Sequence, residues 1–382
     1  MNLTYILGNG MDLQLGLPTR FKDFYDWAEK EDKNNLFLPH NYNVEENENW
    51  SDFESMFIDV FNDYLRLYNG KSDSLKLKEY LNQYNTHMVL NNAFNLSKED
   101  FFDFLVEQVD QVGTLLEEYL LVIDNEIKKS KTTKETMNKI KYDLYHLDKM
   151  FMNNLANRQK IREYIGKYPT SRYFVNIITL NYTSTTKILN ESMSNSVPIK
   201  VDDRTFTFSK SSTPTYLHGR LYSPEWKEGI TLGTHSITQI DEEFRDLENA
   251  KFLSKIDKTK LVMGRRDYSQ AKQILSNESN IIVCYGVSFG MSDRELLATV
   301  LNKAQENKAI IIFYEYFSSI GSLAWVRQKL KKKVMQNFLN VLPELQNDEE
   351  AKNNVSKNLI AIPINNTENL IQIKSKIYPV KG

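Results

Sequence analysis

The sequence lacks several features that would assign it to a common class of protein. Cys284 is its only cysteine in 382 residues, which excludes an internal disulfide and a zinc cluster built on cysteines. No apolar run approaches the roughly 18 residues that a membrane helix requires, and the first residues do not form a signal peptide. These absences predict a protein of the reducing cytoplasm without a membrane-spanning segment.

An excess of charge of either sign is also missing. Lys and Arg together number 48, and Asp and Glu together number 50, so that the formal net charge is -2. A protein that mainly coats nucleic acid or an anionic membrane is usually strongly basic. The charge balance therefore argues against nucleic acid and membranes as partners.

The histidines predict neither a metal site nor a serine hydrolase. They are His40, His87, His146, His218 and His235. No two of them have the close spacing of paired metal ligands. Residues 286–290 match the Gly-x-Ser-x-Gly elbow of hydrolases, but the histidine of an α/β-hydrolase follows its serine, and every histidine here precedes Ser288.

What the chain does contain is a series of apolar, β-branched segments separated by helical patterns. These segments are residues 3–7, 173–180, 280–285, 309–314 and 359–364. Strands that alternate with helices favour a mostly parallel sheet flanked by helices. We predict a Rossmann-like α/β core formed by residues 1–74 and 169–382.

Residues 75–168 predict a large helical insertion in this core. They contain few glycines or prolines, and apolar residues recur at intervals of three and four. A charged turn near residues 128–134 separates two or three long helices. These helices offer surfaces on which the chain can form homo-oligomers.

The first predicted strand ends in the glycine turn Gly8-Asn9-Gly10. Two glycines that flank one residue allow a sharp turn and a close approach of backbone amides to a ligand, and the next helix points its positive end there. The dinucleotide fingerprint also requires a third glycine, at a position where this chain has Leu13. Both a structural turn and a phosphate-binding turn therefore remain open.

Polar residues follow two of the later strands. Asn181 comes directly after strand 173–180, and His218 follows a short strand and precedes a glycine. Ligands of α/β sheets bind at the carboxyl ends of the strands, and imidazole titrates near neutrality, as a general base requires. We therefore predict both as catalytic candidates, with His235 as a weaker one; Asn181 could instead cap a turn or helix.

In their order and setting these motifs resemble those of known proteins. The opening Ile-Leu-Gly-Asn-Gly-Met-Asp-Leu-x-x-Gly-Leu-Pro-Thr is similar to the signature of the bacterial AbiH abortive-infection family. The same similarity extends to residues 50–54, 180–183, 218–219 and 286–293. More distantly, the order of the motifs resembles that of the sirtuin-like superfamily.

The resemblance implies an anti-phage effector that responds to an unknown phage-derived trigger and cleaves the nicotinamide–ribose bond of NAD. NAD would be its substrate, with no tightly bound cofactor and no zinc. His218 would act as the base, while Asn181 orients the ribose or water. The implied nucleotide-binding residues are Gly8, Asn9, Gly10, Asp12, Gly16, Leu17, Pro18, Thr19, Tyr182, Thr183, Gly286, Ser288 and Asp293.

Two positions depart from the superfamily pattern. Asp12 stands where sirtuins have a serine, and a carboxylate at a helix start competes with phosphate for the same amides. Thr183 stands where many members carry an aspartate that contacts nicotinamide. These departures leave open two alternatives, namely a non-catalytic nucleotide-binding sensor or toxin component, and an enzyme that acts on another nucleotide.

Overall fold

The computed structural model divides into two compact units. The first comprises Met1–Pro18, Ile123–Arg220 and Arg266–Gly382, and the second comprises Thr19–Val122 and Leu221–Arg265. The residues that the structure describes are 1–31, 50–70, 97–129, 131–147, 155–166, 173–201, 204–210, 213–221, 230, 240–246, 266–290, 293–316 and 323–364. The predicted boundaries of the helical insertion, residues 75 and 168, lie outside these ranges, so that this division stays a prediction.

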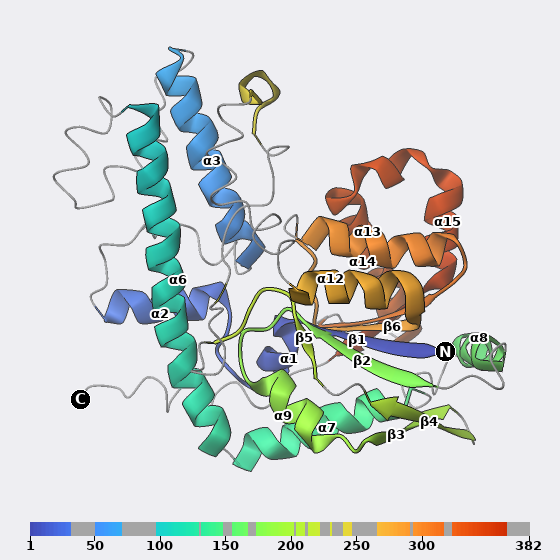
Figure 1. Ribbon diagram of the computed structural model, residues 1–382. Coiled ribbons are helices and arrows are strands. Elements are labelled where there is room, and N and C mark those ends of the chain that lie inside the picture. The colour runs from blue at the N-terminus through green and yellow to red at the C-terminus, as the bar shows by residue number, and fades with distance from the viewer. Residues whose placement is uncertain are drawn as a thin grey trace. The chain divides into compact units, whose positions relative to one another are not determined.

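The first unit is built on a sheet of eight strands (Figure 1). Their order is β3-β4-β2-β1-β6-β7-β8, with β5 paired to β2. The strands are β1 (Asn2–Leu7), β2 (Phe174–Thr179), β3 (Ser196–Val201), β4 (Arg204–Lys210), β5 (Thr215–Tyr216), β6 (Ser279–Tyr285), β7 (Ile310–Tyr316) and β8 (Leu359–Ile364). Among these pairs only β3 and β4 run antiparallel. The prediction of an α/β fold with a mostly parallel sheet is confirmed.

The strand order creates a switch point at β1. From β1 the chain passes first to β2 on one side and later to β6 on the other side. The last residues of four parallel strands are paired across the sheet, because Leu7 pairs with both Thr179 and Tyr285, and Thr179 pairs with Tyr216. The loops that follow β1, β2, β5 and β6 therefore leave the sheet at the same edge, where open α/β sheets bind ligands.

Helices cover both faces of this sheet (Figure 1). Those of the first unit are α1 (Asn9–Gln14), α7 (Lys131–Tyr145), α8 (Leu155–Gly166), α9 (Thr185–Ser192), α12 (Arg266–Gln273), the π-helical turn η5 (Ile274–Glu278), α13 (Arg294–Gln305), α14 (Leu323–Val341), the 3-10 turn η7 (Pro343–Asn347) and α15 (Glu349–Asn358). Alternate residues of β1 face opposite layers: Ile6 packs in the cluster formed with α13, α14 and α15, while the Tyr5 hydroxyl donates to the Leu144 carbonyl of α7 over 2.7 Å.

The central strands consist mainly of apolar residues because both faces of the sheet are covered. Every residue of β1 is buried. Cys284, in β6, is fully buried in the cluster that joins the sheet to α13 and α14. Burial raises the pKa of its thiol well above the ordinary value.

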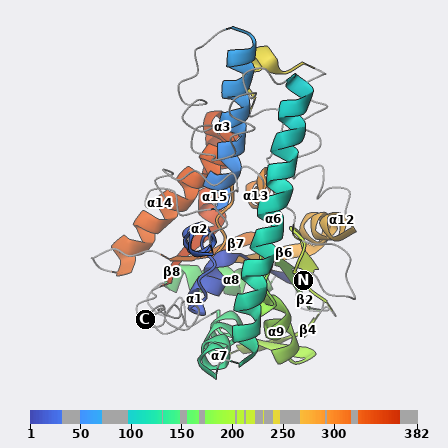
Figure 2. The ribbon, with the colours of Figure 1, turned by 90° about the vertical axis from the view of Figure 1, so that its left-hand side faces the viewer.

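The second unit is helical. Its described elements are α2 (Phe21–Lys30), α3 (Trp50–Tyr68), the greater part of α6 (Lys98–Lys129) and the 3-10 turn η4 (Glu242–Phe244). Helices α3 and α6 lie side by side (Figures 1 and 2). Their contact is aromatic, since the ring centroids of Tyr64 and Phe101 are 3.6 Å apart and those of Phe61 and Phe102 are 4.6 Å apart.

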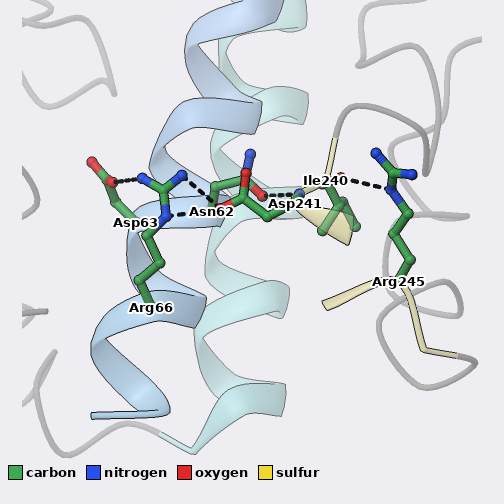
Figure 3. Close-up of polar contacts among 6 residues, drawn as sticks. All are labelled: Asn62, Asp63, Arg66, Ile240, Asp241 and Arg245. Atoms are coloured by element: carbon green, nitrogen blue, oxygen red, sulfur yellow. Dashed lines mark hydrogen bonds and ion pairs between the residues drawn. The ribbon is translucent and has the colours of Figure 1, made fainter. Parts of the chain in front are cut away.

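Polar contacts join the segment 240–246 to α3 within this unit (Figure 3). The Arg66 guanidinium binds the carboxylate of Asp241 through Nε at 2.8 Å and Nη2 at 2.6 Å. It also contacts Asp63, one turn away on α3, at 3.2 Å. The Asp241 amide donates to Oδ1 of Asn62 over 3.1 Å. This cluster fastens the segment to the helix.

The predicted helices between residues 75 and 168 are confirmed where the structure describes them. They are α6, α7 and α8; α6 ends at Lys129 and α7 begins at Lys131, both within the predicted charged turn. Each helix in the described ranges is too short or too polar to cross a lipid bilayer.

Candidate functional site

The polar strand-end motifs predicted from the sequence meet at the switch-point edge of the sheet. The β1–α1 turn contacts the loop after β6, α1 contacts the loop after β2, and the segment after β5 contacts the start of α13. Loops from four parallel strands are thereby linked by direct contacts. Three features of this edge carry distinct chemistry: the glycine turn, a buried carboxylate network and a histidine–aspartate pair.

The glycine turn is packed backbone to backbone against Gly286. A Cβ atom at Gly10 would lie 2.5 Å from Cα of Gly286, and one at Gly8 would lie 2.5 Å from the Gly286 carbonyl oxygen. The Gly8 amide donates to the Tyr285 carbonyl over 3.0 Å, and the Gly10 amide donates to the Gly286 carbonyl over 2.8 Å. The two glycines are needed for this close approach. Their amides donate hydrogen bonds to carbonyl groups at the end of β6, whereas the sequence analysis expected them to point at a phosphate.

Gly16 and Leu17 terminate helix α1. The Gly16 amide donates to the Leu13 carbonyl and the Leu17 amide donates to the Asp12 carbonyl, each over 3.0 Å. Gly16 has φ 79°, the left-handed conformation that closes a helix in the Schellman arrangement, and a proline commonly follows. Pro18 does so here. Thr19, also a predicted binding residue, is buried in the second unit.

Asp12 lies at the centre of a buried network. Its Oδ1 accepts from the Thr185 hydroxyl over 2.6 Å and from Nδ2 of Asn181 over 3.2 Å. Its Oδ2 is 2.8 Å from the Thr183 hydroxyl. The Thr183 and Thr185 hydroxyls are themselves 2.8 Å apart. All four side chains are buried, so the β2–α9 loop is held against α1 by polar contacts that exclude water.

Burial raises the pKa of Asp12 to about 7. Two hydroxyl hydrogen bonds, from Thr185 and Thr183, act in the opposite direction, while the negative charge of Asp124 raises the pKa further. Asp12 thus changes its charge close to neutral pH. Strongly perturbed carboxyl groups of this kind are concentrated at functional sites.

Two buried polar atoms of the β2–α9 loop have no hydrogen-bond partner among the described residues. Among the described residues, Oδ1 of Asn181 and Oγ of Ser184 are buried and form no hydrogen bond. Ser184 is the N-cap residue of α9, but its side chain does not cap the helix; its amide donates to Asp124 over 2.7 Å. An unpaired buried polar atom costs about 1–3 kcal/mol. A ligand that satisfied them would offset this cost.

His218 forms a buried pair with Asp293. Nε2 of the imidazole lies 2.9 Å from Oδ1 of the carboxylate, and both residues are 8% exposed. Asp293 is the N-cap residue of α13, yet its side chain binds the histidine and does not cap the helix. The Tyr182 ring lies 6.3 Å from the imidazole. Ser288, in the loop between β6 and α13, is exposed.

Other predicted candidates are placed differently or lie outside the described residues. His235 is among the latter. Helix α13 begins at Arg294, with Asp293 as its N-cap residue. Among the described residues, no group of three or more His, Cys, Asp or Glu side chains is arranged to hold a metal ion.

Sequence reasoning missed two relations in the site. Thr185 makes the shortest contact with Asp12, and the signal for it was the run of hydroxyl residues from 183 to 186, which begins three residues after the predicted strand 173–180. Asp293 was predicted as a nucleotide contact, not as the partner of His218. These two residues are separated by 75 positions, and no local pattern connects them.

An open, mostly parallel sheet with polar loops at its switch point defines a class of α/β proteins that carry their site at the carboxyl edge of the sheet. Within that class, the chain belongs to the family described as Bacteriophage abortive infection AbiH, whose model matches residues 4–315. The match includes every predicted site residue. No curated protein matched the chain.

The family membership predicted from the sequence motifs is thereby confirmed, and with it a role in anti-phage abortive infection. The more distant sirtuin-like resemblance stays a prediction, as does any reaction with NAD.

Proposed function

We propose that the protein serves abortive infection as an NAD glycohydrolase, which binds NAD or a related nucleotide and hydrolyses the nicotinamide–ribose bond. The observation that supports this most directly is the buried His218–Asp293 pair, which lies at the same sheet edge as the Asp12–Asn181 network. The reaction requires a base and a polar group that orients the sugar. A histidine held by a carboxylate and an amide side chain are suited to these two tasks.

In the proposed reaction the C1′–N bond of NAD breaks and nicotinamide leaves as a neutral molecule with the bonding electron pair. The ribose carbon becomes oxocarbenium-like, and the oxygen of a water molecule adds to it while one proton passes to the base. We assign His218 the tautomer in which Nε2–H donates to Asp293, and this tautomer leaves the lone pair on Nδ1. Within the described ranges Nδ1 has no hydrogen-bond partner, so it is available to take the proton.

Asp293 would then stabilise the imidazolium that forms when His218 accepts the proton. Asn181 would hold a ribose hydroxyl or the attacking water. The amides of Gly8 and Gly10 already serve the end of β6, so we assign the phosphate contacts to neighbouring groups such as the exposed hydroxyl of Ser288. The glycines contribute by allowing the two loops to approach each other.

Nicotinamide release from NAD by the purified full-length chain, measured by liquid chromatography and mass spectrometry, tests the proposal. His218→Ala is expected to lower the rate by about 100-fold or more, since general bases contribute 10²–10⁴-fold, and Asn181→Ala is also expected to lower it. His146→Ala is the matched control: its imidazole binds Tyr142 on α7, and activity should be unchanged.

A second arm measures cellular NAD during phage infection, in cells that express the wild-type chain or the His218→Ala variant. This arm supplies the phage-derived trigger that a purified protein lacks. We expect NAD to fall with the wild-type chain only. Full activity of both His218→Ala and Asn181→Ala, in cells and in vitro, would refute the assignment.

The amides of Gly8 and Gly10 already donate within the protein, which favours two further candidates: a protein that binds a nucleotide without cleaving it, and an enzyme that acts on a nucleotide other than NAD. Incubation with a panel of nucleotides, followed by mass spectrometry of free and bound species, separates these cases. Binding without a product under infection conditions would indicate a sensor or toxin component. A product from another nucleotide would identify the substrate.

A further inference from the structure

The contacts of Asp12 fix which way the amide of Asn181 faces. The carboxyl oxygen Oδ1 of Asp12 accepts from the Asn181 side chain over 3.2 Å, and only the NH2 end of an amide can donate such a bond. The other end of the amide, Oδ1 of Asn181, is therefore turned away from Asp12. Among the described residues it is buried and has no hydrogen-bond partner. The site thus presents a buried acceptor.

Asp12 is itself held in a ring of three contacts. Its carboxyl group contacts the hydroxyls of Thr183 and Thr185 at 2.8 Å and 2.6 Å, and these hydroxyls contact each other at 2.8 Å. Two hydroxyls supply only two protons for three contacts. A protonated Asp12 supplies the third, so that each contact in the ring becomes a hydrogen bond while Oδ1 still accepts from Asn181.

The environment of Asp12 is consistent with this proton. Asp12 is 1% exposed, and burial, with the charge of Asp124 on α6, raises its pKa to about 7. Among the described residues, Asp124 is the charged group that acts on Asp12, and the Asp124 carboxylate accepts a hydrogen bond from the Ser184 amide. A neutral carboxyl group therefore suits this buried position at neutral pH.

We propose that Asp12 is a positioning residue that, through its ring with Thr183 and Thr185, holds Asn181 so that Oδ1 is offered to a donor group of the ligand, a sugar hydroxyl. This inference rests on the proposed function and adds to it a determinant of substrate selection. An acceptor that is already buried favours a ligand that donates and disfavours one that lacks the donor, since the latter leaves the acceptor unpaired. Asp12 itself does not contact the ligand.

The test uses carba-NAD, in which a methylene replaces the ring oxygen of the nicotinamide ribose so that the bond is not cleaved. Its 2′-deoxy and 3′-deoxy analogues lack one sugar hydroxyl each. Calorimetry on the full-length chain gives the ratio of dissociation constants between parent and analogue. In the wild-type chain we expect at least one analogue to bind about 10-fold or more weakly, as the loss of a donor to a buried acceptor predicts.

The variants separate positioning from a general loss of structure. Asp12→Ala and Thr185→Val break the ring, and we expect both to reduce the discrimination to less than 3-fold. Asp12→Asn is the conservative rescue, because its NH2 group can donate to Thr183 as a protonated carboxyl does, and it should retain the wild-type ratio. Thr186→Val is the matched control: its hydroxyl contacts Thr179 at 2.9 Å, outside the ring, and the ratio should not change.

The outcomes distinguish this inference from the function on which it rests. If the wild-type chain binds neither carba-NAD nor NAD, with or without infected-cell extract, the proposed function fails and the inference fails with it. If the chain binds NAD but Asp12→Ala and Thr185→Val discriminate as the wild type does, the inference is wrong and the proposed function stands. Equal binding of the parent and both analogues by the wild type also overturns the inference.

Discussion

The β1–α1 turn and the β2–α9 loop follow neighbouring parallel strands and leave the sheet at the same edge, but they are built in opposite ways. The turn contacts Gly286 through backbone atoms and uses its amides for hydrogen bonds to the end of β6. The loop contacts α1 through side chains and keeps two buried polar atoms unpaired among the described residues. We call the backbone contact of Gly8 and Gly10 with Gly286 the seam; it packs the two turns together. The polar groups that could bind a ligand lie in the β2–α9 loop.

The largest effect is expected where the seam is filled. Gly286 has φ +60°, and a Cβ atom there would lie 2.5 Å from Cα of Gly10 and 2.6 Å from the amide nitrogen of Met11. The neighbours are backbone atoms that cannot rotate away. Gly286→Ala should therefore lower the free energy of unfolding by about 4 kcal/mol, from strained φ and steric overlap together. Denaturant unfolding followed by circular dichroism measures this loss.

Gly70→Ala is the control for the conformational part of that loss. Gly70 has φ +67°, but no atom of the described residues lies within 4 Å of its Cβ position. Only the left-handed conformation is then penalised, at about 1 kcal/mol. Equal losses at Gly70 and Gly286 would show that the seam is not tightly packed and would remove the contrast between the two regions.

The next largest effect is the pH dependence that Asp12 contributes to the free energy of unfolding. The pKa of Asp12 is about 7 in the folded chain against an ordinary value of 3.8 for an aspartate, so between these values the folded state binds more protons than the unfolded state. Stability from this group is full at low pH and falls as pH rises. Between about pH 4.5 and 7.5 the fall is about 3 kcal/mol.

Asp12→Asn should remove this slope, since an amide does not titrate. The difference between variant and wild type, measured by urea unfolding at several pH values, isolates Asp12 from other groups, including Asp143, whose pKa burial raises to about 6. Above neutral pH the variant should be the more stable protein. A difference that does not vary with pH would mean that Asp12 is already ionised in the folded chain at low pH.

A smaller effect separates two neighbouring threonines of α9. Thr185→Val removes the 2.6 Å contact with Asp12 and should cost about 2 kcal/mol, as for a hydrogen bond to an acid group. Thr186→Val removes a 2.9 Å contact between two hydroxyls and should cost about 1 kcal/mol. Thermal unfolding of the two variants at pH 8 compares them. The reverse order would place the energetic centre of the loop away from Asp12.

The smallest effect is expected at Ser184. Its hydroxyl caps nothing and is buried and unpaired among the described residues, so Ser184→Ala removes an unsatisfied polar atom and should raise the free energy of unfolding by up to about 1 kcal/mol. A polar atom that does not stabilise the fold is consistent with a loop kept for binding. A loss above about 1 kcal/mol in the same unfolding assay would instead assign the hydroxyl a structural partner.

The main strands could be predicted from the sequence because a strand that is buried on both faces consists mainly of apolar residues, which form a recognisable run. Residues 359–364 were predicted as a strand, and β8 has these bounds. The antiparallel pair of β3 and β4 lacks such a run, because polar and apolar residues alternate along both strands. Alternating, half-exposed strands at a sheet edge carry a weaker signal, and their partners are set by the whole sheet.

The site could be predicted in its location but not in its contacts. Asn181 and His218 were identified because each follows a strand. The carboxyl ends of parallel strands lie at the same edge of the sheet, so residues that follow different strands come together there. The glycine turn was ambiguous for a physical reason: close approach of a phosphate and close approach of Gly286 both require the absence of a Cβ atom. Only the position of a residue some 280 places away resolves this.

Cys284 gives the molecule a built-in reporter. It is the only thiol in the chain, it lies two residues before Gly286 in the middle of the sheet, and it is fully buried. A thiol reagent can reach it only when the centre of the sheet opens. The rate at which Cys284 is labelled under native conditions therefore reports how often the centre of the sheet opens, and no cysteine has to be introduced for this measurement.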